Sequence, residues 1–133
     1  MIHAGFIEIP VLDLDRAVKF YQDVFGLATV TPYVDDVRRV AVLFSEEDSQ
    51  IPGISLNQTA NFEPTAKGQL VYYNASEDLA VYTERVIAAG GKVIAPKESM
   101  GGAGDFIIFG DTEGNAFAFY SEMAPETDAE AAA

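Results

Sequence analysis

The strongest constraint on the fold is a pattern that occurs twice along the chain: a short apolar segment and a helix, followed by three β-type segments. In the first copy, apolar residues recur at helical spacing from Ala17 to Phe25, and Gly26 follows them, which is typical of a helix that ends in a left-handed turn. In the second copy the helical segment ends at Gly90, about half of the chain further on. Internal repetition predicts two copies of one structural unit. Because Ala-Val occurs in both helices, we expect Ala17 and Ala80 to be equivalent and to let each helix lie close to its sheet.

Turn residues and runs of branched or aromatic residues set the expected boundaries of each element. The first helix is expected to be capped by Asp13 or Asp15, and the second by Ser76 or Asp78, because these side chains accept hydrogen bonds from first-turn amides. The sequence predicts helices at 16–25 and 79–89 and strands at 6–11, 29–34, 39–44, 54–57, 70–74, 92–95, 105–109 and 116–121.

Composition and charge exclude several classes of protein. With 49% hydrophobic and 22% charged residues, most of the chain is expected to fold. The formal net charge of −13 argues against nucleic acid or anionic membranes as partners, because both are bound through basic patches. The absence of cysteine excludes disulfides and thiolate catalysis, and the single histidine excludes sites of two or three imidazoles within one chain. That residue, His3, is expected at the surface, with a role as ligand or base across a dimer as the alternative.

Nothing in the sequence indicates membrane insertion. No window comes near the roughly 20 consecutive apolar residues of a membrane span. The first eight residues lack the basic region of a secretory signal, and Glu8 interrupts their apolar run. We therefore expect a cytoplasmic protein without membrane contact.

Two motifs resemble a known family. Residues 11–21, Val-Leu-Asp-Leu-Asp-Arg-Ala-Val-Lys-Phe-Tyr, with Val-Phe-Gly-Leu at 24–27, resemble the first helix of the vicinal oxygen chelate superfamily. That group contains glyoxalase I, bleomycin-resistance proteins, fosfomycin-resistance proteins and extradiol dioxygenases. The turn Asp-Thr-Glu-Gly-Asn at 111–115 resembles the hairpin before the family's last strand. The resemblance covers about residues 2–121 and is specific for the fold rather than for one chemistry.

The resemblance implies an α+β fold with two tandem βαβββ modules, at about 2–58 and 68–121, that form a cupped eight-stranded mixed sheet. Residues 1–123 are then one glyoxalase/bleomycin-resistance-like domain, and residues 124–133 a flexible acidic and alanine-rich tail. The resemblance also implies a homodimer with cups formed between modules. Open sheet edges and apolar faces favour the same association.

In that family a metal is held by the first and last strands of each module. Carried over to this sequence, the four ligand positions fall at Phe6, Ser55, Gln69 and Ala118. Of these, Gln69 offers the one plausible ligand atom, and a single neutral oxygen does not make a site for a divalent cation. We therefore expect no metal and no cofactor.

Glu8 is the main candidate for chemistry. Strand alternation places Glu8 with Phe6 on one face and Ile7 with Ile9 on the other. Because the helix must cover the isoleucines, Glu8 is expected to point into the cup. Its carboxylate either contacts a ligand or acts as a general base. Alternatively, it pairs with Arg38, Arg39 or backbone amides, or it is hydrated at the open mouth of the cup. Alternation also assigns Tyr72, Phe117 and Phe119 to the core beneath the helix, and Tyr73 and Tyr120 to the cupped face with Gln69 and Ala118. The residues predicted to bind ligand are Phe6, Glu8, Ser55, Asn57, Gln69, Tyr73, Ala118 and Tyr120.

Two functions remain open on these grounds. The first is a protein that binds or sequesters a small organic molecule in a metal-free cup; an acidic, aromatic-lined cup suits a cationic or amphipathic molecule. The second is a glyoxalase-like lyase or isomerase that uses Glu8 or a recruited divalent metal. The glycine-rich segment 101–104 precedes a strand rather than opening a helix, so we interpret it as a flexible loop over the rim of the cup and not as a phosphate-binding loop.

Overall fold

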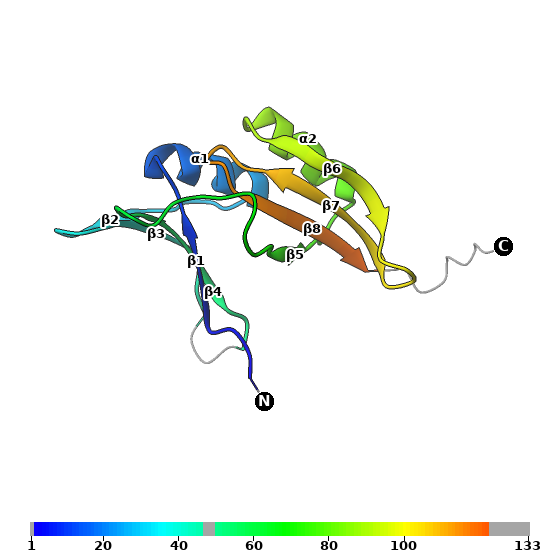
Figure 1. The fold of residues 1–133 in the computed structure, drawn as a ribbon, viewed down its shortest axis with the longest axis horizontal. Coiled ribbons are helices and arrows are strands. Elements are labelled where there is room, and N and C mark those ends of the chain that lie inside the picture. The colour runs from blue at the N-terminus through cyan, green and yellow to red at the C-terminus, as the bar shows by residue number, and fades with distance from the viewer. Residues whose placement is uncertain (1, 47–49, 123–133) are drawn as a thin grey trace.

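The computed structural model describes residues 2–46 and 50–122 and shows two helices and eight strands (Figure 1). The predicted tail and most of the acidic segment at 46–48 lie outside the described residues. The elements are β1 (Phe6–Pro10), α1 (Leu14–Phe25), β2 (Pro32–Val34), β3 (Arg39–Phe44), β4 (Gly53–Gln58), β5 (Tyr72–Asn74), α2 (Leu79–Ala88), β6 (Lys92–Ser99), β7 (Gly104–Gly110) and β8 (Ala116–Glu122).

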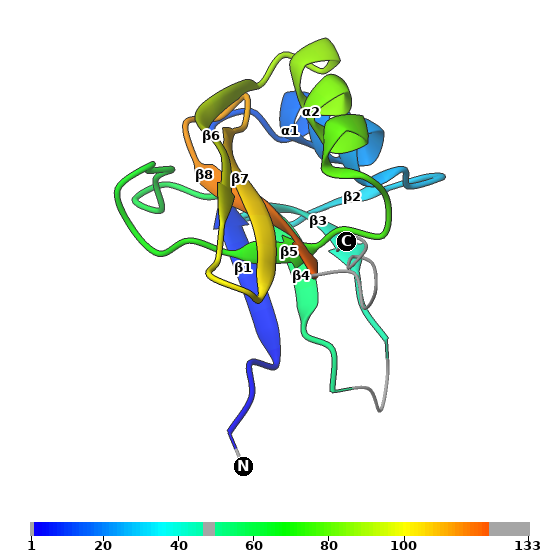
Figure 2. The ribbon, with the colours of Figure 1, turned by 90° about the vertical axis from the view of Figure 1, so that its right-hand side faces the viewer.

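The two halves of the chain have the same topology, which confirms the predicted repeat. The strands form two four-stranded sheets, in the orders β1-β4-β3-β2 and β5-β8-β7-β6. In each sheet the first strand of the module pairs in parallel with the last, and the other pairs are antiparallel. The two helices lie next to each other on the same side of the two sheets (Figure 2). The α+β fold with two βαβββ modules is therefore confirmed, with the eight strands divided between two hydrogen-bonded sheets.

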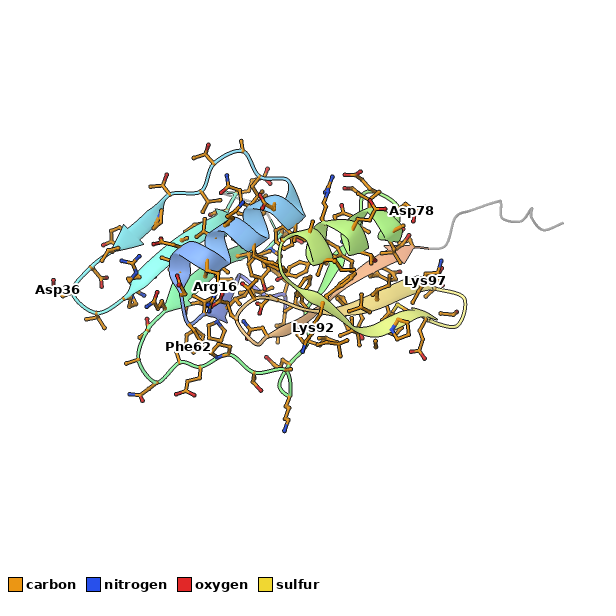
Figure 3. All side chains as sticks on the ribbon, turned by 90° about the horizontal axis from the view of Figure 1, so that it is seen from above. Arg16, Asp36, Phe62, Asp78, Lys92 and Lys97 are labelled. Atoms are coloured by element: carbon orange, nitrogen blue, oxygen red, sulfur yellow. The ribbon has the colours of Figure 1, made fainter. Side chains whose placement is uncertain are left out.

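Local hydrogen bonds explain where the helices begin and end. The side chain of Asp13 accepts a hydrogen bond from the amide of Arg16, and α1 ends at Gly26, whose φ of 73° a residue with a side chain rarely adopts. Asp78 caps α2 by accepting from the amide of Ala80 at 3.0 Å (Figure 3). The helix caps are therefore Asp13 and Asp78, and not Asp15 or Ser76. No helix in the described part of the chain is long and apolar enough to cross a membrane.

The expected equivalence of Ala17 and Ala80 is wrong. Ala17 is fully buried against the first sheet, whereas Ala80 is exposed. Counted from the two capping aspartates, the residue equivalent to Ala17 is Tyr82, which is buried. An alanine suits any position of a helix, so the repeated Ala-Val pair carried no information about which side of α2 faces the sheet.

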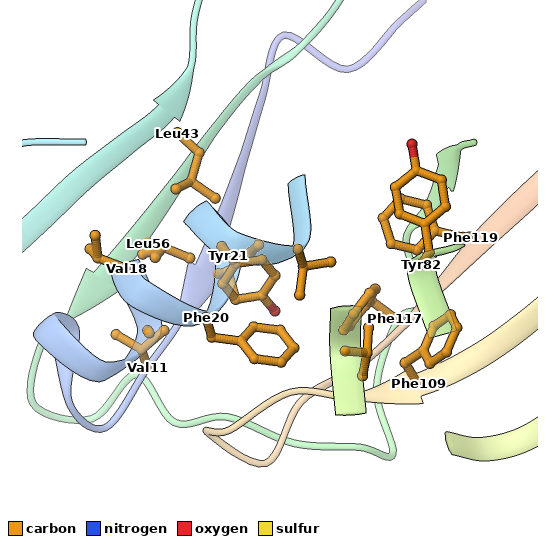
Figure 4. Packing of buried hydrophobic residues seen from close by; sticks show 14 of the residues in the cluster. Val11, Val18, Phe20, Tyr21, Leu43, Leu56, Tyr82, Phe109, Phe117 and Phe119 are labelled. Atoms are coloured by element: carbon orange, nitrogen blue, oxygen red, sulfur yellow. The ribbon is translucent and has the colours of Figure 1, made fainter. Parts of the chain in front are cut away.

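One apolar core connects both modules (Figure 4). The first module contributes the buried face of α1, and the ring of Tyr21 lies 5.9 Å from that of Phe117 in the second module. Tyr82 stacks on Phe119 with a centroid distance of 4.0 Å. Tyr73 also belongs to this layer, because its ring contacts Phe117 and Phe119 and the register pairs Tyr73 with Phe119. Tyr72 is 42% exposed, so its assignment to the core beneath the helix is wrong, while that of Phe117 and Phe119 is confirmed.

A buried carboxylate fastens the second module to the first. Glu113 lies in the turn between β7 and β8, and one of its oxygens accepts hydrogen bonds from the amides of Leu12 and Asp13, both at 2.9 Å. The guanidinium of Arg16, near the start of α1, donates to both oxygens at 2.7 and 3.0 Å (Figure 3). Thr112 adds a further hydrogen bond at 2.8 Å. The turn is therefore held on the N-terminus of α1, where a negative charge is also favoured by the helix dipole.

A second carboxylate completes this junction. Asp111 accepts a hydrogen bond from the hydroxyl of Tyr21 at 2.5 Å and from the side chain of Asn115 at 3.0 Å. Asn115 in turn donates to the carbonyl of Pro10 at the end of β1. Burial and the charge of Asp111 raise the pKa of Tyr21, which therefore stays a hydrogen-bond donor. The turn at 111–115 thus contacts both β1 and α1 of the first module.

Replacement of Glu113 tests this junction. We expect Glu113→Gln to lower the free energy of unfolding at pH 7 by about 2–4 kcal/mol, because breaking a buried charged pair costs about 3–5 kcal/mol and Arg16 is half exposed. Urea denaturation measures this change. Glu84→Gln, at an exposed position of α2, is the control and should change stability by less than about 0.5 kcal/mol.

The same variant predicts a pH dependence. Burial by itself would raise the pKa of Glu113, but hydrogen bonds from Arg16, Thr112 and two amides leave the pKa below its ordinary value of 4.5. The carboxylate therefore stabilises the fold above pH 4.5, and this contribution is lost as the pH falls from 4.5 through the lower folded-state pKa. The stability difference between wild type and Glu113→Gln should shrink over that range. A difference that stays constant down to about pH 3 would contradict this role.

Candidate functional site

The side of the first sheet that faces away from α1 carries the candidate carboxylate. The register places Glu8 beside Ser55 on β4, and Ser55 beside Val42 on β3, so these three side chains share one face. Ile9 and Leu56 are buried on the opposite face, which confirms the predicted alternation along β1. We call the set Phe6, Glu8, Val42, Ser55 and Asn57 the first open face.

The first open face is apolar around Glu8. Phe6 is 54% exposed and Val42 is 47% exposed. The ring of Phe6 lies over Gly53, where an added side-chain carbon would come within 2.6 Å of it. A larger residue at this position would therefore displace the Phe6 ring from its place over Gly53.

Two polar groups on this face have no protein partner in the described ranges. Glu8 makes no ion pair there, because Arg38 pairs with Asp35 at 3.6 Å and Arg39 pairs with Asp15 at 3.5 Å. The predicted alternative of an ion pair between Glu8 and either arginine is therefore wrong. Next to Glu8, the hydroxyl of Ser55 is fully buried and has no hydrogen-bond partner among the described residues. A buried hydroxyl without a partner is costly and rare.

A pocket of about 200 Å³ opens where β1 meets the segment that leads into β5. Both β1 and β5 are edge strands of their sheets, so the pocket lies at the seam between the modules. It brings together three of the predicted ligand-binding residues, Glu8, Gln69 and Tyr73. Burial and the charge of Asp111 raise the pKa of Tyr73, which keeps its phenol protonated. Tyr21, Thr65, Val71 and Asn115 also line this pocket and were not predicted.

The remaining predicted residues lie on the second sheet. The register pairs Ala118 with Tyr72 and with Ile108, and Tyr120 with Phe106. We call these five residues the second open face, since they point away from the face that packs on the helices. The hydroxyl of Tyr120 donates to the carbonyl of Ala103 at 2.8 Å and so holds the glycine-rich loop against β8. Tyr72 on this face is exposed, and Phe106 and Tyr120 are half-buried. Tyr72 was missed because the pairing between β5 and β8 cannot be read from one sequence, and Phe106 was also not among the predicted ligand-binding residues.

The four family ligand positions do not suit a metal ion. Phe6 and Ala118 have no donor atom, and Ser55 offers one neutral hydroxyl. Gln69 is exposed and offers a neutral amide. Among the described residues, no three His, Asp or Glu side chains come close enough together to hold a metal. This donor set provides no negative charge to replace the hydration shell of a divalent cation.

Comparisons with known proteins agree with this fold. The family model described as Glyoxalase/Bleomycin resistance protein/Dioxygenase superfamily matches residues 3–119. A glyoxylase-like domain-containing protein from Didymella fabae is 32% identical over 114 residues, which are 84% of this chain and 88% of that protein.

Solved structures show the same architecture at low sequence identity. A glyoxylase/bleomycin resistance protein/dioxygenase domain from Frankia sp. EAN1pec has a TM-score of 0.68 at 19% identity, covering 92% of this chain and 98% of that one. The fosfomycin resistance protein FosX from Listeria monocytogenes has a TM-score of 0.67 at 19% identity, covering 95% of each chain.

Proposed function

Because the chain belongs to the Glyoxalase/Bleomycin resistance protein/Dioxygenase superfamily, we propose that it binds a small organic molecule in a cup that contains no metal. The observation that carries this proposal is the first open face. It combines an exposed aromatic ring at Phe6, the carboxylate of Glu8 without an ion-pair partner among the described residues, and the buried, unpartnered hydroxyl of Ser55. These groups suit recognition of an organic molecule better than coordination of a cation.

The chemistry of this face favours a cationic or amphipathic ligand. A carboxylate beside an aromatic ring binds an organic cation through charge and through the face of the ring. The net charge of −13 attracts cations to the protein from a distance. The exposed amide of Gln69 would hydrogen-bond polar groups of the ligand. Tyr73 and Tyr120 complete the proposed lining, and the buried residues Ser55, Asn57 and Ala118 form the floor beneath it.

We propose that the cup is completed in a homodimer. Both open faces carry exposed apolar side chains, among them Phe6, Val42 and Tyr72. A folded protein rarely leaves such faces in water, and a second copy of the chain can cover both with a two-fold arrangement. The cup would then form between modules.

A second candidate function is a metal-free lyase or isomerase with Glu8 as general base. The observation that favours it is the pocket at the seam, where Glu8 shares a wall with Gln69 and with the protonated phenol of Tyr73. A carboxylate that lines a pocket together with hydrogen-bond donors can remove a proton from a bound substrate. A glyoxalase-like activity that survives metal chelation and is lost in Glu8→Gln would establish this function.

Metal content tests the proposed cup directly. We expect the dialysed protein to hold no stoichiometric Zn²⁺, Ni²⁺ or Fe²⁺, because the four inherited ligand positions offer no anionic or imidazole donor. Elemental analysis measures the content, and thermal melts with and without added metal check for weaker binding. One tightly held metal per chain that is lost on Glu8→Gln or Gln69→Ala would contradict the proposal.

Light scattering tests the dimer. We expect a particle of twice the chain mass of 14.3 kDa at micromolar concentration. Val42→Asp, on the first open face, should give a monomer because it places a charge in the covered surface. Val37→Asp, in the turn between β2 and β3 where Val37 is 75% exposed, is the matched control and should leave the dimer intact. A stable wild-type monomer would refute this arrangement.

A further inference from the structure

A second hollow lies between the modules. Tyr73 lines both this hollow and the pocket at the seam. The volume of the second hollow is about 310 Å³. The first module contributes Phe25 and Leu27 at the end of α1, with Leu43 and Ile54 from its sheet. The second module contributes Tyr82 from α2 and Phe119 from β8. We call this hollow the inter-module groove.

The groove is apolar and aromatic, with one polar end. None of the described residues that line it is charged, although the chain as a whole carries a net charge of −13. Phe119 and Tyr82 stack on each other within its wall, and Phe25 packs edge-on against Tyr73 at 5.0 Å. At the polar end, the hydroxyls of Ser76 and Tyr82 lie 3.0 Å apart.

The polar end also includes backbone groups of β5 that do not bond to β8. Asn74 lines the groove from β5, which is an edge strand of the second sheet. In a parallel pair, every second residue of the edge strand hydrogen-bonds through its backbone to the neighbouring strand. Here the amide of Ala75 and the carbonyl of Val71 form such hydrogen bonds with β8. The backbone groups of Asn74 therefore face away from β8, at the open edge. A ligand in the groove can reach these groups and the Asn74 amide.

Size and composition favour a small molecule as the occupant. A volume of 310 Å³ lies at the small end of the range of about 300–1,000 Å³ for ligand pockets. Residues 124–133 have no aromatic or branched aliphatic side chain, so this stretch of the chain offers nothing that would fill an apolar hollow. The uncharged lining disfavours an ionised molecule, which would lose its hydration without gaining a counter-charge.

We propose that the inter-module groove binds one neutral, mainly apolar organic molecule that has an aromatic ring and a single hydrogen-bonding end. The ring lies on the wall that Phe25, Tyr82 and Phe119 form by packing on one another, and the polar end reaches Asn74 and Ser76. This site is distinct from the two open faces. It shares only Tyr73 with the residues predicted to bind ligand, since Tyr73 lines both the groove and the pocket at the seam.

A neutral fluorescent probe, N-phenyl-1-naphthylamine, tests the groove. Its emission rises in apolar surroundings, and we expect saturable binding of one probe per chain. Ile51→Asp places a charge on the wall of the groove at a position that is 59% exposed, and it should weaken binding at least tenfold. Ile87→Asp, on α2 at 57% exposure and outside the lining, is the matched control and should bind as wild type does.

Further measurements separate binding in the groove from binding elsewhere on the protein. The anionic probe 1-anilinonaphthalene-8-sulfonate should bind at least tenfold more weakly than the neutral one, and Val42→Asp on the first open face should leave binding of the neutral probe unchanged. Circular dichroism checks that each variant is folded. Equal binding to Ile51→Asp and Ile87→Asp, or no saturable binding to wild type, would overturn the proposal. A change from dimer to monomer in Ile51→Asp alone would overturn it by assigning the groove to a second copy of the chain.

Discussion

The arrangement of the two modules depends on the carboxylate of Glu113. This side chain is fully buried, and it is tolerated because two backbone amides, a guanidinium and a hydroxyl all donate to it. Removing any one donor would leave a buried charge with too few partners, which is costly in an apolar environment. The turn between β7 and β8 of the second module is therefore fixed on α1 of the first module. Asp111 and Asn115 extend this contact to Tyr21 and to the end of β1.

This junction explains where the proposed binding surfaces lie. It holds the second module against α1 and the end of β1, so the aromatic core closes between the modules and packs on the helices. The sides of the two sheets that face away from the helices then remain open, and Phe6, Val42 and Tyr72 stay exposed. At the seam, the edges of β1 and β5 enclose a pocket rather than pairing with each other. A single chain therefore presents the proposed cup as two separate surfaces, which is why the proposal includes a second copy.

The sequence predicted the elements well because their signals are local. The capping aspartates, Gly26 and the alternation along β1 are properties of a few adjacent residues, and they located α1 and the face that carries Glu8. The prediction of β3 at 39–44 agrees with the structure at both ends. The pairing of strands that are distant in the sequence could not be predicted in the same way. Tyr72 and Tyr73 were assigned to the wrong faces because β5 is three residues long and its register against β8 leaves no local signal.

Part of the candidate site and its surroundings also could not be predicted from the sequence. The motif at 111–115 was predicted as a turn, but nothing local indicated that Glu113 binds α1 about a hundred residues away. The inter-module groove arises from six elements of both modules, so no single segment predicts it. In contrast, the residue types alone predicted that the four family ligand positions do not suit a metal, since Phe6 and Ala118 have no donor atom. The other two positions are Ser55 and Gln69.

The proposed function requires that the carboxylate of Glu8 recognises an organic molecule without a metal. Calorimetric titration with benzyltrimethylammonium, an aromatic cation, in the presence of EDTA tests it most directly. We expect saturable binding to wild type and at least tenfold weaker binding to Glu8→Gln, a loss of about 1.4 kcal/mol or more, while Glu84→Gln binds as wild type does. Binding that is equal in Glu8→Gln, or that appears only when EDTA is replaced by a divalent metal, would contradict it.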